Sequence, residues 1–224
     1  MPNPPQAPRR ALLVIDVQNE YATGALRIQY PPLADSLRNI DRAMDAAHAA
    51  GIPVVVVQQS APPGAPLFAT GSHGWELHEV VASRPRDHWL CKTLPSAFAG
   101  TGLGEWLRAR AIDAVTVVGY MTHNCDDTTI KHAFDAGLRV EFLMDASGSV
   151  PYANRAGSAT AEEIHRVFAV VQQSRYAAVT TTDDWIAHLA EGTAPERDSI
   201  HASHRRALAA ASAPAGGATG HGRH

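Results

Sequence analysis

The sequence predicts an α/β fold in which helices cover both faces of a parallel β-sheet. Short apolar runs alternate along the chain with segments whose apolar residues recur at helical spacing, which is the order expected of βαβ units. The apolar runs are continuous rather than alternating, as in the four valines of 54–57, and this indicates strands buried on both faces. We therefore expect an open, mostly parallel sheet whose ligands bind at the carboxyl ends of its strands.

Each expected element has a local signal of length, periodicity or punctuation. The predicted strands are 11–17, 53–57, 88–92, 114–120, 140–144 and 177–181. The predicted helices are 33–47, 103–112, 125–136 and 159–173, and Gly51 and Gly137 end the first and third of them. Proline and glycine throughout 60–74 predict a long loop.

The chain of 224 residues fits one domain with two flanking segments. Residues 1–10 are rich in proline and are predicted to be a flexible leader without a secretory signal. Residues 11–190 form the predicted domain. Periodicity fades after about Gly192, so 191–224 is predicted to be disordered or docked on a partner.

Composition excludes several classes of function. A formal net charge of -3 does not provide the basic surface that nucleic-acid binding needs. No apolar run reaches the roughly 20 residues that span a bilayer, so no membrane partner is expected. Two cysteines, Cys91 and Cys125, cannot form a disulfide framework, and we expect a cytoplasmic protein.

Three residues of different chemistry fall at predicted strand ends: Asp16, Lys92 and Cys125. A thiol attacks a carbonyl only after losing its proton, and a carboxylate can accept that proton. An ammonium group and a helix N-terminus both favour the thiolate, and nearby backbone N–H groups can stabilise an oxyanion. The pattern predicts a cysteine nucleophile with Asp16 as base and Lys92 as the cation between them.

Several nearby residues have two interpretations. Asp126 and Asp127 would raise the pKa of Cys125 if they faced it, but we interpret them as partners of the helix dipole. Cys91 precedes Lys92 on a strand, so it points to the opposite face, where we expect it to fill the core. His123 is a second candidate base. Tyr21, Phe68, Trp75 and His123 are the candidates for lining a substrate pocket.

Three segments of the chain resemble the isochorismatase-like cysteine hydrolases. LLVIDVQNEY resembles the first-strand segment and places the family aspartate on Asp16, and KTLPSAF places the family lysine on Lys92. VVGYMTHNCDDTTIKHAFDAGLRVEFLMDAS carries a G-x-x-T-x-x-C pattern that places the family cysteine on Cys125. The resemblance covers roughly 11–186 and implies a doubly wound three-layer fold with a six-stranded parallel sheet.

The resemblance also implies details of the site and of the assembly. It implies a non-proline cis peptide between Tyr120 and Met121, and oxyanion donors in the backbone amides of Met121 and Cys125. It further implies a homodimer or homotetramer, with partner residues near the pocket.

The segment QQSAPPGAPLF lacks the Asp-x-His…His motif of the metal-dependent nicotinamidases, so we expect no metal and no cofactor. Members that cleave isochorismate lack the cysteine, so its presence favours hydrolysis of a C–N bond in a small amide, ureide or lactam. The alternative is a non-catalytic binding or scaffold protein on the same fold.

Overall fold

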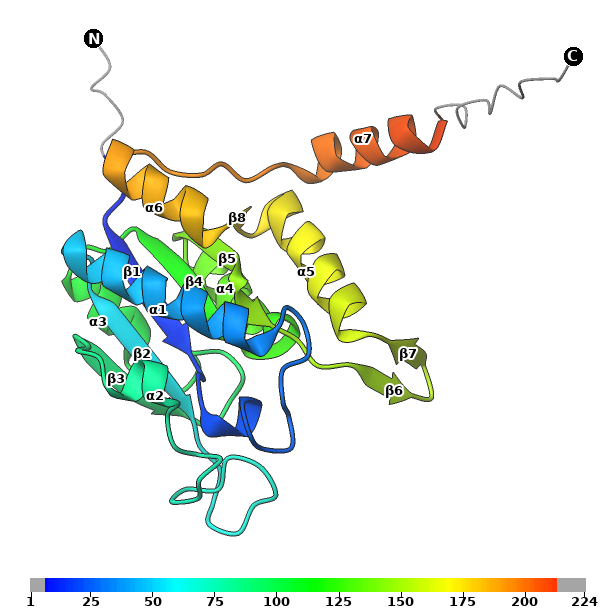
Figure 1. Cartoon of the computed structure of the whole chain (residues 1–224). Helices are drawn as coiled ribbons and strands as arrows, with labels where there is room; N and C mark the ends of the chain where they lie inside the picture. Colours follow the sequence, from blue (N-terminus) through cyan, green and yellow to red (C-terminus); the bar gives the residue numbers. More distant parts are fainter. Residues whose placement is uncertain (1–6, 213–224) are drawn as a thin grey trace, which may run out of the picture.

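A six-stranded sheet forms the middle layer of the protein in the computed structural model, which describes residues 7–212 (Figure 1). Its strands are β1 (Arg10–Ile15), β2 (Val54–Gln59), β3 (His88–Lys92), β4 (Ala114–Tyr120), β5 (Arg139–Gly148) and β8 (Ala178–Thr180). The strand order is β3-β2-β1-β4-β5-β8, and all neighbouring pairs are parallel. The predicted doubly wound fold with six parallel strands is therefore confirmed.

Helices cover both faces of this sheet. They are α1 (Leu33–Ala49), α2 (Glu79–Ala82), α3 (Leu103–Ala109), α4 (Asp127–Asp135), α5 (Ala161–Arg175), α6 (Thr182–Glu191) and α7 (Ile200–Ser212). One core layer joins α1 and α6 to the sheet through residues such as Met44 and Trp185. The other joins α3 and α4 to the opposite face through residues such as Leu107 and Ile130. Continuous apolar strands are the sequence signature of this two-sided burial.

A buried ion pair ties the amino ends of the central strands together. The Arg10 guanidinium donates Nε and Nη2 hydrogen bonds to Glu141 at 2.8 to 3.0 Å. Thr116 Oγ1 and Trp185 Nε1 donate to Glu141 Oε2 at 2.7 and 2.8 Å. Because Arg10 opens β1 and is 5% exposed, the predicted leader 1–10 extends too far into the fold. Residues 1–6 of that leader lie outside the described residues.

Two features differ from the sequence prediction in the second half of the chain. A short hairpin of β6 (Tyr152–Asn154) and β7 (Gly157–Ala159) projects from the sheet before α5 (Figure 1). Helix α7 lies in the tail that was predicted to be disordered, so that prediction is wrong for 200–212. The helix projects away from the sheet and buries none of its residues (Figure 1). Residues 213–224 lie outside the described residues, and docking on a partner stays a prediction.

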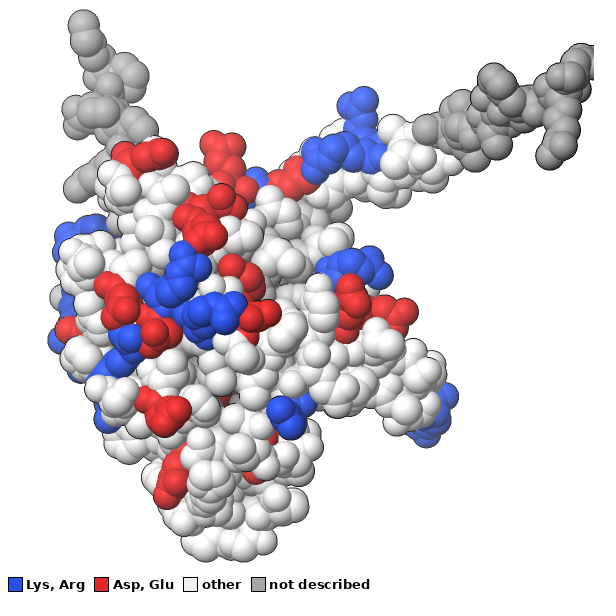
Figure 2. Space-filling view, in the orientation of Figure 1, with Lys and Arg blue, Asp and Glu red and all other residues white. Residues whose placement is uncertain are grey.

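The surface over α1 and α6 carries interspersed acidic and basic side chains (Figure 2). Arg42 of α1 pairs with Asp183 of α6, and Arg38 pairs with Asp35 within α1. Within 7–212, no helix has the length and apolar character needed to cross a membrane.

Candidate active site

The three predicted site residues come together at the carboxyl ends of three strands. Asp16 follows β1, Lys92 ends β3, and Cys125 lies in a π-helical turn, Thr122–Asp126, between β4 and α4. Their exposed fractions are 0% for Asp16, 2% for Lys92 and 4% for Cys125. The helix predicted from Cys125 thus begins earlier, at Thr122, and its first turn is widened, a deviation that is frequent at functional sites.

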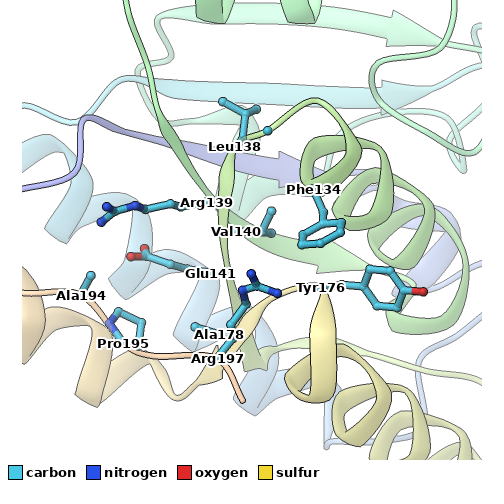
Figure 3. Close-up of a pocket in the computed structure, with 11 residues that line it drawn as sticks. Phe134, Leu138, Arg139, Val140, Glu141, Tyr176, Ala178, Ala194, Pro195 and Arg197 are labelled. Carbon is cyan, nitrogen blue, oxygen red and sulfur yellow. The ribbon is translucent and has the colours of Figure 1, made fainter. Parts of the chain in front are cut away.

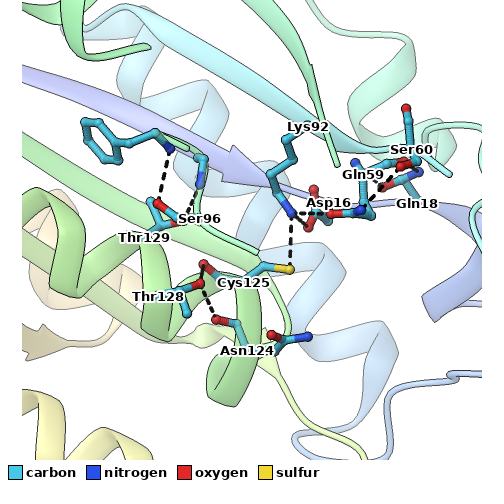
Figure 4. Close-up of polar contacts among 12 residues, drawn as sticks. Asp16, Gln18, Gln59, Ser60, Lys92, Ser96, Asn124, Cys125, Thr128 and Thr129 are labelled. Carbon is cyan, nitrogen blue, oxygen red and sulfur yellow. Dashed lines mark hydrogen bonds and ion pairs between the residues drawn. The ribbon is translucent and has the colours of Figure 1, made fainter. Parts of the chain in front are cut away.

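The Lys92 ammonium bridges the other two side chains (Figure 4). Its Nζ atom lies 2.7 Å from Asp16 Oδ2 and 3.2 Å from Cys125 Sγ. The third donor of this ammonium goes to Gln59 Oε1 at 2.6 Å. Lys92 therefore uses all three of its N–H groups inside the protein.

The backbone holds Asp16 and the turn before Cys125 in fixed positions. Asp16 has φ 51°, a left-handed conformation that is uncommon for a residue other than glycine and marks local strain. Gly119 has φ 117°, and a Cβ there would lie 2.0 Å from the carbonyl oxygen of Ile15. Strands β1 and β4 thus touch directly beneath the site, and only glycine permits this approach.

The turn that carries Cys125 is fastened to two neighbouring elements. The peptide between Tyr120 and Met121 is cis, as the resemblance implied. Thr122 Oγ1 lies 3.2 Å from the carbonyl oxygen of Gly148 and 2.8 Å from His165 Nδ1. Among the described residues, the Met121 amide donates no backbone hydrogen bond, so it remains available to a ligand.

Burial dominates the protonation of the site. Burial and the Asp16 carboxylate raise the pKa of the Cys125 thiol far above its usual range, and the Lys92 ammonium offsets only part of this rise. Burial also raises the pKa of Asp16, with Lys92 opposing it. Burial lowers the pKa of Lys92, but the charges of Asp16 and Cys125 outweigh that effect and hold it above its usual value. Burial therefore favours a neutral resting thiol on Cys125, which the predicted base Asp16 would have to deprotonate.

Two glutamines that the sequence analysis did not select position Lys92. Gln18 Nε2 donates to the Gln59 carbonyl oxygen, and the Gln59 amide donates to Gln18 Oε1, both at 2.9 Å. This clamp fixes Gln59, whose side chain accepts the hydrogen bond from Lys92. For Gln59, the sequence did carry a signal: two side-chain amides, Gln58 and Gln59, come directly after four valines at a strand end.

A cavity of about 350 Å³ opens above Cys125. Its lining includes the predicted pocket residues Tyr21 and Phe68, whose ring centroids lie 5.3 Å apart. The full lining is Tyr21, Leu26, Gln59, Leu67, Phe68, Thr93, Pro95, Met121, Asn124, Cys125 and Tyr152. Tyr152, from the hairpin, was missed because its three-residue strand carries no periodic signal.

Trp75 and His123, the other two pocket candidates, do not line this cavity. The Trp75 indole donates to Ser60 Oγ at 2.8 Å and so braces the loop 60–74. His123 Nδ1 lies 3.1 Å from Ser149 Oγ, and its ring contacts Tyr152 edge-on. Burial lowers the pKa of His123 to about 4, and its ring hydrogen-bonds Ser149 rather than the Cys125 thiol, so the structure does not pair it with Cys125 as a base.

Two further interpretations of polar residues need correction. Cys91 is exposed and does not fill the core, although it does point to the face opposite Lys92. Asp126 is 0% exposed and faces the interior instead of the helix dipole. Burial and the Asp16 charge hold the pKa of Asp126 well above its usual range. Asp127 lies in the first turn of α4, where the interpretation as a partner of the helix dipole placed it, and it pairs with Lys131 at 2.7 Å.

A larger hollow of about 470 Å³ lies at the opposite end of the sheet (Figure 3). Residues of α4, β5 and the segment after α6 line it, among them Arg139, Glu141 and Arg197. Glu141 is already saturated by Arg10, and neither cysteine lines this hollow. The cavity above Cys125 is therefore the better candidate for catalysis, despite its smaller size. Within 7–212, no three His, Cys, Asp or Glu side chains gather as metal ligands.

Comparisons with known proteins agree with this architecture. The model of the isochorismatase domain matches residues 10–184, so the chain belongs to the isochorismatase family. A crystal structure of an isochorismatase-like protein from Burkholderia xenovorans LB400 is 63% identical, with a TM-score of 0.91, over 93% of this chain and 100% of that one.

Two named relatives are more distant. A streptothricin hydrolase of Streptomyces noursei is 37% identical over 61% of this chain, and the match spans only 49% of that relative's length. A ureidoacrylate amidohydrolase of Agrobacterium fabrum is 28% identical over 61% of this chain and 75% of its own. The chain is thus an isochorismatase-family hydrolase with amidohydrolases among its relatives.

Proposed function

We propose that this protein hydrolyses the C–N bond of a small amide, ureide or lactam through a thioester on Cys125. The observation that carries the proposal is the position of Lys92 Nζ, within hydrogen-bonding distance of both Asp16 Oδ2 and Cys125 Sγ. A carboxylate, an ammonium and a thiol in one buried cluster are the groups that covalent amide hydrolysis needs. The amidohydrolases among the relatives support the same bond type.

Acylation begins with the neutral thiol. Asp16 accepts the proton of Cys125, and the thiolate attacks the carbonyl carbon of the amide. The backbone amides of Met121 and Cys125 hold the oxygen that becomes negative. When the C–N bond breaks, the amine leaves with the proton from Asp16, and a thioester remains on Cys125.

Deacylation reuses the same groups. Asp16 removes a proton from a water molecule, and the resulting hydroxide attacks the thioester carbonyl. The C–S bond breaks, the acid product leaves, and the proton on Asp16 returns to the sulfur. Lys92 keeps its charge throughout and stabilises the negative charge as it moves between oxygen and sulfur.

The raised pKa of Cys125 means that the mechanism depends on Asp16 to form the thiolate. Because the resting thiol is neutral, the thiolate forms only when Asp16 takes the proton. Asp16 also has a raised pKa, which makes its carboxylate a stronger base than it would be in water. Both groups owe these shifts chiefly to burial.

The test is a panel of small amides, ureides and lactams, assayed for ammonia or amine release and for an acyl adduct on the Cys125 peptide by mass spectrometry. We expect turnover of at least one compound, together with an adduct confined to Cys125. Turnover without any adduct on Cys125, persisting after Cys125→Ala, would contradict the thioester. No turnover of the whole panel would favour a binding or scaffold protein.

A further inference from the structure

The cavity above Cys125 has an uncharged lining. None of its described lining residues is an Asp, Glu, Lys, Arg or His. Aromatic and aliphatic side chains of Tyr21, Leu26, Leu67, Phe68 and Tyr152 provide most of the wall. The loops beyond the carboxyl ends of β1 and β2 are also mostly uncharged on the face seen in Figure 2. A charged group brought into this space would lose hydration without gaining a partner of opposite charge.

The buried lysine does not change this conclusion. An ammonium has three N–H donors, and those of Lys92 go to Asp16, Gln59 and Cys125. Its side chain is 0% exposed. A substrate carboxylate could reach Lys92 only by displacing Asp16 or Gln59, and this would dismantle the site.

Tyr21 gives the cavity one buried polar group. The residue is 2% exposed, and its ring is fixed by Phe68 and by Tyr120, whose centroid lies 5.5 Å away. Burial, together with the charges of Cys125 and Asp16, holds the pKa of Tyr21 well above its usual range, so its hydroxyl stays a donor. No side-chain hydrogen bond from Tyr21 to another described residue is found, in contrast to Tyr120, whose hydroxyl lies 2.7 Å from Ser36 Oγ.

We propose that the cavity admits uncharged amides or ureides with a compact aromatic or branched apolar body, excludes those that carry a carboxylate, and binds them through the Tyr21 hydroxyl. That these compounds are substrates rests on the proposed function. The binding preference itself is a property of the cavity alone. The volume of about 350 Å³ is at the small end of ligand pockets and suits a body of about one ring.

Two alkylating reagents test the charge preference without any turnover. Iodoacetamide is a neutral amide and iodoacetate is its anionic counterpart, while exposed Cys91 is a reference thiol in the same molecule. We expect the ratio of iodoacetamide to iodoacetate rates at Cys125 to exceed the ratio at Cys91 by at least about tenfold, or ~1.4 kcal/mol. Equal ratios at the two cysteines would overturn the proposal, whether or not the protein hydrolyses amides.

Protection of Cys125 from iodoacetamide tests two further parts of the proposal, the apolar body of the ligand and its contact with the Tyr21 hydroxyl. Benzamide should slow alkylation of Cys125 in the wild-type protein, and 4-carbamoylbenzoate at the same concentration should not. Protection by neither compound, or better protection by the anion, would overturn the proposed ligand class.

Tyr21→Phe keeps the ring and removes the hydroxyl. It should weaken benzamide protection by about threefold to tenfold, the range of one hydrogen bond, when protection is measured against the alkylation rate of the same variant without benzamide. Tyr120→Phe is the matched control, because its hydroxyl is bonded to Ser36 and Tyr120 does not line the cavity. Equal protection in Tyr21→Phe and the wild type would remove Tyr21 from the proposed contact.

Discussion

Two buried ion pairs lie at opposite ends of the same sheet, and they differ in how fully their charges are satisfied. At the amino end, Glu141 accepts hydrogen bonds on both carboxylate oxygens from Arg10, Thr116 and Trp185. At the carboxyl end, Lys92 approaches one oxygen of Asp16, and the other oxygen, Oδ1, has no partner among the described residues. Both oxygens of the first carboxylate are hydrogen-bonded, whereas the second carboxylate has an oxygen without a partner.

The difference distinguishes a structural ion pair from a candidate reactive site. A buried ion pair whose hydrogen bonds are all made is held in one geometry. A buried carboxylate that lies beside a thiol and lacks part of its hydrogen bonds has a higher affinity for a proton. General-base chemistry needs this higher affinity. The predictions below alter one member of each cluster and ask whether stability or chemistry responds.

The largest effect should follow Cys125→Ser. A serine hydroxyl is a much weaker acid than a thiol, so turnover should fall by at least about 10⁴-fold, or ~5 kcal/mol, while the free energy of unfolding changes little. Steady-state kinetics and urea unfolding measure the two quantities. Cys91→Ser is the control and should retain activity, because Cys91 is exposed on the opposite face of β3. An inactive, stable Cys91→Ser would mean that the wrong thiol was chosen.

Glu141→Gln tests the structural ion pair between Arg10 and Glu141. The substitution leaves Arg10 buried without its counter-ion and should lower the free energy of unfolding by about 3 kcal/mol. Cys125 should still react with iodoacetamide at the wild-type rate, because the pair lies at the other end of the sheet. Asp35→Asn breaks an exposed pair with Arg38 and should cost less than about 1 kcal/mol. If the two variants lost equal stability, the contrast between buried and exposed pairs would fail.

Lys92→Met should shift the titration of the thiol. Lys92 lowers the pKa of Cys125 against the raising effects of burial and Asp16, so its loss raises that pKa further. We expect the curve of alkylation rate against pH to move upward by at least about one unit, or ~1.4 kcal/mol. Two negative groups would then lack their shared cation, and turnover should fall. An unmoved curve would make Lys92 a bystander.

Chelation should have the smallest effect. Neither cluster presents a set of three metal-ligating side chains within 7–212, and the sequence lacks the histidine motif of the metal-dependent branch. Dialysis against a strong chelator should therefore leave turnover unchanged. Activity that is lost on dialysis and restored by zinc, iron or manganese would show that the reaction needs a metal.

The three residues that meet at the candidate site could be selected from the sequence because each one marks a strand end with an unusual residue type. Asp16 follows five apolar residues, and Cys125 follows a strand in a motif of fixed spacing. Exposure of Cys91 could not be predicted, since it depends on β3 being the edge strand, and strand order is a long-range property. The orientation of Asp126 was missed because the π-helical turn rotates side chains away from the positions of a regular helix.

The tail and the hairpin were missed for other reasons. Helix α7 contains an alanine-rich run that favours helix by intrinsic propensity, but no buried face gives it a periodic pattern. Tyr152 enters the cavity from a hairpin too short to show alternation. Gln59 was overlooked because its function comes from the clamp with Gln18, which joins residues 41 positions apart.

The close approach at Gly119 separates the residues that should stay unchanged in a redesign from those that can be varied. Since a Cβ at 119 would collide with Ile15, the two strands that lead to Asp16 and to the Cys125 turn form one closely packed block. Mutational libraries aimed at new substrates should leave this block alone. They should vary Leu26, Leu67 and Tyr152, which line the cavity from outside the six-stranded sheet and can change its shape without moving the reacting atoms.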